Sequence, residues 1–204
     1  MQKNILKNGV KNRMEACNLP ICIEIKDKVY PINRNGEHRV ILDIIKAFND
    51  SSLTPEEKAY VTLNIFYDFN LPEDAEDVKL AANEMIKFIN RGQTQPENYV
   101  NKKTLIDWNK DYFMIADGLV KVLGYDVRDT ERYTHWWTFV GACSQIGEGF
   151  LNTVVSIRSK RQKGKKLEKW EQEFYRENRE VIDAVSDMSD EERKRLQDYL
   201  DEDW

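Results

Sequence analysis

Apolar residues recur every three or four positions along most of this chain, and that spacing constrains the fold more than any other feature. In the clearest run the apolar side chains keep this step up to Gly124: Leu105, Trp108, Tyr112, Ile115, Leu119 and Val122. Such spacing puts the side chains on one face of a helix. We therefore predict a helix of about five turns over 104–124.

The same period marks further helices before and after this run. Residues Thr54, Pro55 and Glu57 supply an N-cap, a first-turn proline and a capping-box glutamate. The predicted buried faces are Val40, Ile41, Ile44, Ile45 and Phe48; Tyr60, Leu63, Phe66 and Tyr67; Ala75, Val78, Ala82, Met85 and Ile89; Tyr133, Trp136, Trp137 and Val140; Leu151, Val154, Val155 and Ile157; and Trp170, Phe174, Val181 and Ile182.

One segment near the N-terminus has a strand period instead. Ile21, Ile23 and Ile25 alternate with Cys22 and Glu24, and a polar turn leads into a return strand at Val29-Tyr30. We predict a mainly α fold, a compact multi-helix domain with a small N-terminal β-hairpin. Its expected divisions are a polar extension over 1–18, the helical domain over 19–185 and an acidic C-terminal helix or tail over 186–204.

Composition narrows the class of partner. The net charge of −5, from 31 basic and 36 acidic residues, argues against nucleic acid as a partner of the whole molecule. The three cysteines show no CxxC spacing, which is typical of a reducing compartment. The sequence has no signal-peptide pattern and no run of about 20 apolar residues, so we expect an intracellular protein that does not cross a membrane.

Catalytic patterns are missing from the sequence. His38 and His135 are its only histidines, and neither lies in a metal-binding or nucleophile motif. There is also no glycine-rich loop of the kind that holds phosphates. We therefore expect a non-enzymatic protein with no catalytic, metal-binding or cofactor-binding residues.

Two stretches leave alternatives open. Trp136 and Trp137 are neighbours, about 100° apart on a helix, so either the helix is buried over a wide arc or one indole faces a partner. The favoured partner contacts are Trp137, Phe150 and Trp170. The run Arg158–Lys169 has seven basic residues and one acid. The run can be a solvated connector, can contact nucleic acid or can dock on an acidic protein surface. The acidic tail of the same chain could also cover it.

Several motifs in this order resemble a known family. The hairpin ends in "VYPIN", an "LTPEEK" helix start follows, and "DYFMIADGLVKVLGYDV" runs into "HWWTF". Over 19–179 the chain resembles the phage gene-product-fifteen family. Its members are small proteins of Gram-positive-type bacteriophages and prophages. The resemblance marks Tyr30, Pro31, Ile32, Trp136, Trp137 and Phe139 as fold-defining. The polar N-terminal extension and the segment "GACSQIGEGF" depart from the family pattern.

The resemblance implies a function in tail assembly. Family members are generally encoded between the major tail protein and the tape-measure protein, the position of a tail assembly chaperone. The implied protein works in the host bacterial cytoplasm, coats the tape-measure protein, is displaced by the major tail protein and uses no cofactor. Whether the protein forms a homo-oligomer is left open by the resemblance. The alternatives are a structural component of the tail or head–tail connector, and a nucleic-acid-binding module that uses the basic run.

Overall fold

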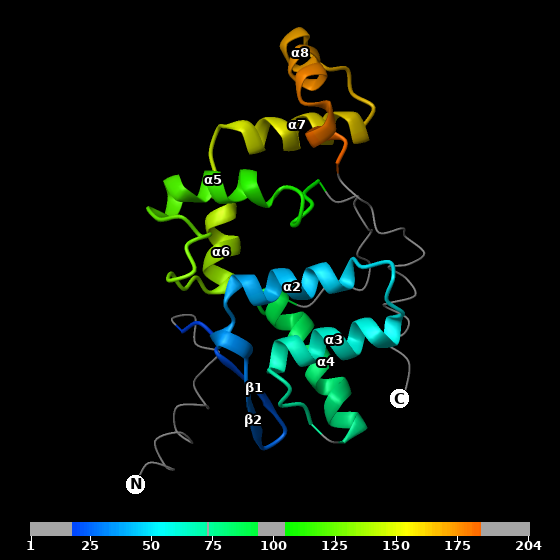
Figure 1. Cartoon of the computed structure of the whole chain (residues 1–204), viewed down its shortest axis with the longest axis vertical. Coiled ribbons are helices and arrows are strands. Elements are labelled where there is room, and N and C mark those ends of the chain that lie inside the picture. Colours follow the sequence, from blue (N-terminus) through cyan, green and yellow to red (C-terminus); the bar gives the residue numbers. More distant parts are fainter. Residues whose placement is uncertain (1–17, 73, 94–104, 185–204) are drawn as a thin grey trace. The chain divides into compact units, whose positions relative to one another are not determined.

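The computed structural model describes residues 18–93, except residue 73, and 105–184, and it is mainly α with one two-stranded antiparallel sheet (Figure 1). The described residues form two compact units. Unit 1 holds 18–93 together with Thr134–Trp137, and unit 2 holds 105–133 and 138–184. The predicted fold class is confirmed. The expected boundaries of the helical domain, at residues 18 and 185, stay a prediction. Nearly all of the N-terminal extension and all of the C-terminal tail lie outside the described residues.

Unit 1 begins with the predicted hairpin. Strand β1 (Cys22–Ile25) pairs antiparallel with β2 (Lys28–Pro31), and the side chains of Ile23 and Ile25 are buried while Ile21 stays exposed. The hairpin lies against helix α4 (Ala75–Ile89), which supplies the apolar cover that two strands need in water (Figure 1). A 3₁₀ turn, η1 (Asn33–Asn35), follows the hairpin and ends at Gly36.

Helices α2 (His38–Phe48), α3 (Pro55–Tyr67) and α4 complete unit 1. The predicted capping box at the start of α3 is present: the Thr54 hydroxyl accepts from the Glu57 N–H at 3.3 Å, and the Glu57 carboxylate accepts from the Thr54 N–H at 2.8 Å. At the other end of α3 the Tyr67 hydroxyl donates to the carbonyl of Ala81 at 2.8 Å. Burial of that hydroxyl is therefore compensated by a hydrogen bond.

Two predicted buried faces in unit 1 were partly wrong. Tyr60 is 67 % exposed, because α3 turns Ala59, Leu63 and Phe66 toward the core instead. On α4 the buried aromatic side chain is Phe88, whereas Ala75 is exposed. The sequence spacing gave the helical period of these segments correctly and misplaced the stripe around the helix axis.

Unit 2 contains α5 (Tyr112–Leu123), most of α6 (Trp136–Cys143), α7 (Phe150–Gln162), α8 (Lys169–Glu177) and α9 (Arg179–Ile182). The helix predicted over 104–124 is shorter than expected, because α5 begins only at Tyr112. The Asp107 carboxylate accepts the N–H groups of Asn109 and Lys110 at 3.0 and 3.1 Å, which holds this stretch in a turn.

The other helix ends in unit 2 also differ from the sequence pattern. Tyr133 lies before α6 and is exposed, and α7 continues to Gln162, five residues beyond Ile157, the last residue of its predicted buried face. The helix expected over the segment that contains Trp170 and Ile182 is interrupted at Asn178. The Asn178 side-chain amide donates to the Phe174 carbonyl at 2.9 Å and so ends α8.

A buried ion pair holds unit 2 together. The Arg158 guanidinium on α7 binds the Asp111 carboxylate through two hydrogen bonds of 2.5 and 2.9 Å, and both side chains are almost fully buried. Its remaining N–H groups donate to the carbonyls of Leu105, Val181 and Ile182. One arginine thus joins the segment before α5 to α7 and α9, with its charge paired and its donors satisfied.

We predict that Asp111→Asn lowers the free energy of unfolding by about 3 kcal/mol or more, because the Arg158 charge is then buried without a counter-ion. Urea denaturation followed by circular dichroism measures the change. The control is Arg132→Ala, whose exposed guanidinium lies 3.8 Å from Asp129 and contributes less than about 1 kcal/mol. Equal effects of the two substitutions would contradict the structural role of Arg158.

Candidate partner-binding surface

The two adjacent tryptophans both belong to unit 1, and both bind the end of the same helix. The Trp136 indole N–H donates to the Ile89 carbonyl at 2.9 Å, and the Trp137 indole N–H donates to the Phe88 carbonyl at 2.8 Å. Carbonyls in the last turn of a helix lack partners within the helix. The indoles therefore complete the C-terminal end of α4, and this favours burial over partner contact for Trp137, which is half-buried.

His135 fixes the same segment from the other side. Its Nε2–H donates to the Pro20 carbonyl at 3.0 Å, and its Nδ1 accepts the Trp137 backbone N–H at 3.1 Å. Both ring nitrogens are therefore engaged in the neutral tautomer that carries hydrogen on Nε2. Gly36 leaves room for this ring, since a Cβ there would lie 3.1 Å from Nε2 and 2.6 Å from the Phe88 ring, and its φ of +75° also favours glycine.

His38 makes a third attachment. Its backbone N–H and its ring Nδ1 both contact the Thr134 carbonyl, at 2.9 and 3.2 Å, while the Trp136 N–H donates to the Gly36 carbonyl at 2.8 Å. We call residues Thr134–Trp137 the clamp segment. Burial lowers the pKa of both histidines, that of His38 to about 4. Neutral rings bonded to carbonyls serve cohesion and are poorly placed for proton transfer with a ligand.

The remaining residues marked by the family resemblance lie in both units. In unit 1 Ile32 is buried, Pro31 is exposed, and Tyr30 packs edge-on against Tyr67 with ring centroids 6.2 Å apart. In unit 2 Phe139 is fully buried beside Trp108 and Tyr112. These contacts are packing contacts, and the fold-defining role of the residues stays a prediction.

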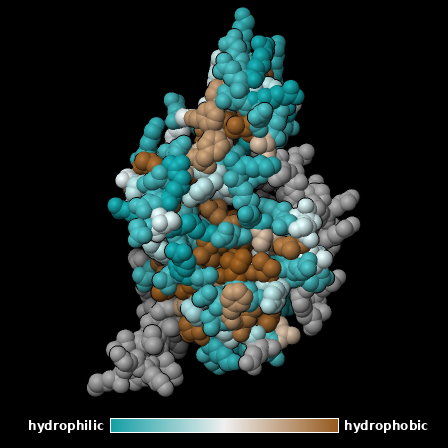
Figure 2. Space-filling model, in the orientation of Figure 1, coloured by the Kyte–Doolittle hydropathy of each residue, from teal (hydrophilic) through white to brown (hydrophobic). Residues whose placement is uncertain are grey.

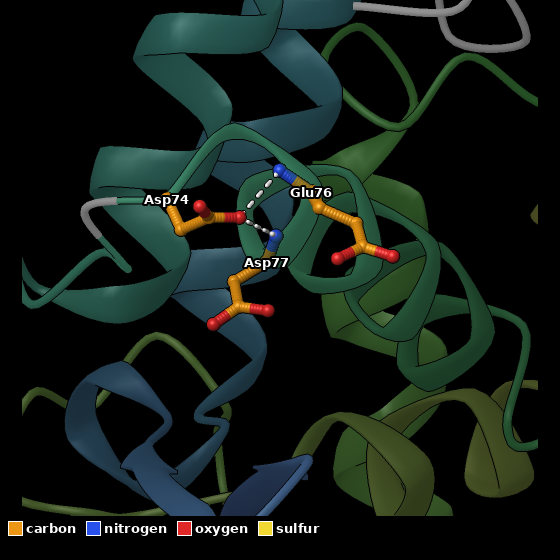
Figure 3. Close-up of side chains that lie close together, drawn as sticks. All are labelled: Asp74, Glu76 and Asp77. Atoms are coloured by element: carbon orange, nitrogen blue, oxygen red, sulfur yellow. Dashed lines mark hydrogen bonds between the residues drawn. The ribbon is translucent and has the colours of Figure 1, made fainter.

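A cluster of three carboxylates stands at the start of α4 (Figure 3). The Asp74 carboxylate accepts the backbone N–H groups of Glu76 and Asp77 at 3.0 and 3.4 Å, so it caps the helix. Glu76 and Asp77 in turn bind the ammonium group of Lys26 at 3.0 and 2.5 Å. The cluster thus tethers the hairpin turn to α4, and a lysine already supplies its cation.

The two cysteine thiols that the structure describes give little sign of nucleophilic chemistry. Cys22 and Cys143 are half-buried and unoxidised, and burial raises the pKa of the Cys143 thiol to about 12. A thiol with this pKa is protonated at neutral pH and is a weak nucleophile.

Unit 2 has an apolar groove between α5 and the start of α7. The groove is a cavity of about 470 Å³ that lies along α5 and the segment that joins α6 to α7. Met114 and Leu151 form its buried floor, and Phe113 and Phe150 stand at its rim, 47 % and 42 % exposed. Hydrophobic side chains reach the surface between α5 and α7 (Figure 2). We call this feature the α5–α7 groove.

Glycine and local packing give the groove its shape. Gly118 on α5 lets the Ile146 side chain approach, because a Cβ at Gly118 would lie only 2.9 Å from Ile146. The Phe150 ring packs against Phe174 on α8 with centroids 5.5 Å apart, so its position is fixed although one side is open. Asp117, Lys121 and Glu148 add charges to the lining. A fixed apolar floor with a mixed polar lining is typical of a binding surface.

Of the three expected partner contacts, the groove takes in Phe150 alone. Trp137 binds α4 in unit 1, and Trp170 lies on α8, 52 % exposed, with its indole N–H donated to the Glu168 carboxylate at 3.0 Å. The sequence pattern did not single out Phe113 or Met114 as lining residues. Phe113 could have been found as the one aromatic residue of α5 that falls outside the predicted buried stripe.

The basic run is not simply a solvated connector. Arg158 is buried against Asp111, the Lys160 ammonium binds the Glu171 carboxylate at 2.7 Å, and the Arg161 guanidinium pairs with Asp183. Three of the seven cations are therefore neutralised inside unit 2, which leaves fewer for phosphates than the sequence count indicated.

These features define a mainly α protein with an apolar groove in unit 2. Within the part of the chain that the structure describes, no helix has the length and apolar character needed to span a bilayer. The chain belongs to the Bacteriophage Gp15 protein family, whose model matches residues 17–183, and the resemblance in the sequence is thereby confirmed. Family membership indicates a structural or head–tail protein of a phage. No curated protein and no solved structure matches the chain significantly.

We predict that the free energy of unfolding falls as the pH drops from 7.5 to 5. The unfolded chain protonates His38 near its ordinary pKa of about 6.5, whereas the folded chain does so only near pH 4, so the unfolded state binds more protons in this window. The stability that this difference contributes is complete above pH 6.5 and decreases below it. His38 alone accounts for a loss of about 2 kcal/mol at pH 5.

Urea denaturation at a series of pH values measures this loss. The matched variant is His38→Asn, whose amide N–H replaces the Nδ1–H donor without a titrating ring. We expect the variant to be less stable at pH 7.5 and to lose less on acidification. A slope identical to that of the wild type would exclude His38 as its source.

Proposed function

We propose that this protein is a non-enzymatic tail assembly chaperone that binds the tape-measure protein of its phage, with the α5–α7 groove as the binding surface. The observation that carries the proposal is the groove itself, in a member of a phage family for which the sequence resemblance implies a gene position beside the tape-measure protein. The expected compartment is the cytoplasm of the host bacterium, and no cofactor is part of the proposal.

The client's chemistry explains why a groove is needed. A tape-measure protein is long and helical, with apolar stripes that associate in water when unprotected. Helix-in-groove binding inserts apolar side chains at i, i+3 or i+4 and i+7 into an apolar channel. The floor formed by Met114 and Leu151 suits this mode, because methionine adapts to side chains of different shape.

Moderate affinity for each copy also fits the role. A groove of this size covers a short stretch of helix, so many copies would bind along one client, each weakly enough to be displaced later by the major tail protein. Several copies that also touch one another would bind cooperatively, so self-association on the client is part of the proposal. The charged content of 33 % would keep such a loaded complex soluble.

The second candidate is a structural component of the tail or the head–tail connector, the class of protein that the family membership itself indicates. Mass spectrometry of purified phage particles separates the two. If the protein is a chaperone, purified particles contain none of it or far less than one copy per ring of the tail tube. If it is a structural component, it is recovered from the particles in a fixed stoichiometry. Nucleic-acid binding through the basic run is less favoured, because Arg158, Lys160 and Arg161 are paired within unit 2.

We predict that Phe113→Asp weakens client binding at least tenfold. The substitution places a charge at the apolar rim of the groove, and a buried aromatic contact contributes about 1.4 kcal/mol or more to binding. The matched control is Tyr60→Asp, the same change of an exposed aromatic residue to an acid on α3 in unit 1.

The measurement is co-expression of each variant with the tape-measure protein of the same phage, followed by quantification of soluble client and of the co-purified complex. The wild type and Tyr60→Asp are expected to keep the client soluble, and Phe113→Asp is not. If the wild type leaves the client insoluble, the chaperone function is wrong. If Phe113→Asp behaves as Tyr60→Asp does, the function can stand but the groove is not its binding surface.

A further inference from the structure

One face of helix α7 carries short polar side chains and lysines. Asn152, Ser156, Ser159 and Lys163 are spaced by three or four residues, so they lie along one side of the helix. They line a second depression of unit 2, about 360 Å³ in volume, whose other lining residues are Leu105, Val155, Lys160 and Lys165. We call it the α7 lysine site. It shares no lining residue with the α5–α7 groove.

The ammonium groups at this site are only partly neutralised within unit 2. The Lys160 ammonium binds the buried Glu171 carboxylate at 2.7 Å. Lys163, Lys165 and the neighbouring Lys166 are exposed, and they make no hydrogen bond or ion pair with any residue that the structure describes. The lining itself contains no carboxylate. Three ammonium groups therefore lack a local counter-ion, and the site favours an anionic ligand.

The turn after α7 brings these lysines together. Gly164 has a φ of +63°, and its N–H donates to the Arg161 carbonyl at 3.0 Å while the Lys165 N–H donates to the Lys160 carbonyl at 2.8 Å. These two bonds form a Schellman motif, which reverses the chain and satisfies the carbonyls at the helix end. Lys165 is thereby held beside the last turn of α7, next to Lys163, and the ammonium groups are not needed to cap the helix.

The rest of the lining favours a protein segment over nucleic acid. Leu105 and Val155 give the site an apolar part, which a phosphate backbone would leave uncovered. Proteins that bind single-stranded nucleic acid add aromatic side chains on which the bases stack, and no aromatic residue lines this site. The net charge of −5 also disfavours nucleic acid. A partner that combines carboxylates with apolar side chains matches both parts of the lining.

The shape of the α7 face fits a helical partner. The side chains of Ser156 and Ser159 are short, so the backbone of a second helix can approach α7 closely, and packed helices lie about 8–10 Å apart. The face from Asn152 to Lys163 extends over about 16 Å, which corresponds to three turns of such a partner. Carboxylates spaced by four residues share one face of a helix, and an apolar stripe can run beside them.

We propose that the α7 lysine site is a docking surface for an acidic amphipathic helix of a partner protein. Carboxylates of the partner pair with the ammonium groups of Lys163, Lys165 and Lys166, and its apolar side chains cover Leu105 and Val155. The ion pairs lie at the rim of an open site, so they select the partner by charge and are weakened by salt. The inference does not rest on the function proposed for the α5–α7 groove.

A nuclear magnetic resonance titration of the full ¹⁵N-labelled chain tests the site. The probe is a synthetic helical peptide of two heptads, with leucine on one stripe and glutamate spaced by four residues beside it. The control peptide has glutamine in place of each glutamate. At low salt we expect the acidic peptide to bind at least tenfold more tightly than the control and to shift the backbone amide signals of 152–165. Equal affinities, or shifts that leave 152–165 unchanged, would overturn the proposal.

Charge reversal makes the test specific. We expect Lys163→Glu/Lys165→Glu to bind the acidic peptide at least tenfold more weakly and to gain affinity for a peptide with lysine in place of glutamate. The matched double Lys28→Glu/Lys46→Glu changes two exposed lysines of unit 1 and the net charge by the same amount, and its affinity is expected to stay within about twofold of the wild type. Equal losses in the two doubles would show attraction by net charge alone and would refute the docking.

A steric variant tests the depression without a change of charge. Ser156→Trp places an indole in the middle of the site, and we expect it to reduce the affinity for the acidic peptide at least tenfold. The matched control is Ser52→Trp, the same change of an exposed serine in unit 1, which should bind as the wild type does. Undiminished binding by Ser156→Trp would mean that the peptide does not occupy the depression, contrary to the proposal.

Fluorescent oligothymidine serves as the competing ligand at the same salt concentration. We expect the wild type to bind it more weakly than the acidic peptide, because the site offers no ring for base stacking. If oligothymidine binds more tightly than the peptide and loses its affinity in Lys163→Glu/Lys165→Glu, the site is a nucleic-acid contact and the proposal is wrong.

Discussion

The hydrogen bonds of the clamp segment to unit 1 are the constraint on which the first half of the structure depends. Its four residues come from far along the chain, yet they bind the carbonyls of Pro20, Phe88 and Ile89 and accept the N–H of His38. The hairpin, the start of α2 and the end of α4 are thereby joined through one short segment. Because these donors and acceptors are buried or half-buried, breaking one bond leaves a polar group with little access to water unsatisfied.

Unit 2 achieves its cohesion differently, through charge. The single guanidinium of Arg158 binds the Asp111 carboxylate and three backbone carbonyls. These groups belong to two segments, the stretch before α5 and the region of α9. Desolvation of a buried ion pair costs free energy, so the pair contributes little net stability. Removal of either partner is strongly destabilising, however, because the other charge then stays buried without a counter-ion. The pair therefore fixes one arrangement of the segments around α7. The α5–α7 groove lies partly on that helix, through Phe150 and Leu151.

Sequence spacing predicted the fold class, the hairpin and the position of most helices, because apolar periodicity reflects burial directly. It failed where a local polar group decided the outcome. The Asp107 carboxylate holds the stretch before Tyr112 in a turn, and the Asn178 amide ends α8, so that a helix predicted as continuous is divided into α8 and α9. Such side-chain bonds to the backbone compete with the helix over one or two residues, a scale that periodicity does not register.

The candidate sites were harder to predict, because they depend on contacts between distant residues. The groove exists because Gly118 admits Ile146, 28 positions further along, and no local pattern marks that approach. The basic run showed the opposite problem: seven cations look alike in sequence, but burial gives Arg158 a structural role and leaves Lys163 and Lys165 exposed. Charge counts therefore overestimate a binding surface until the internal ion pairs are known, and the unpaired remainder indicates where a partner can bind.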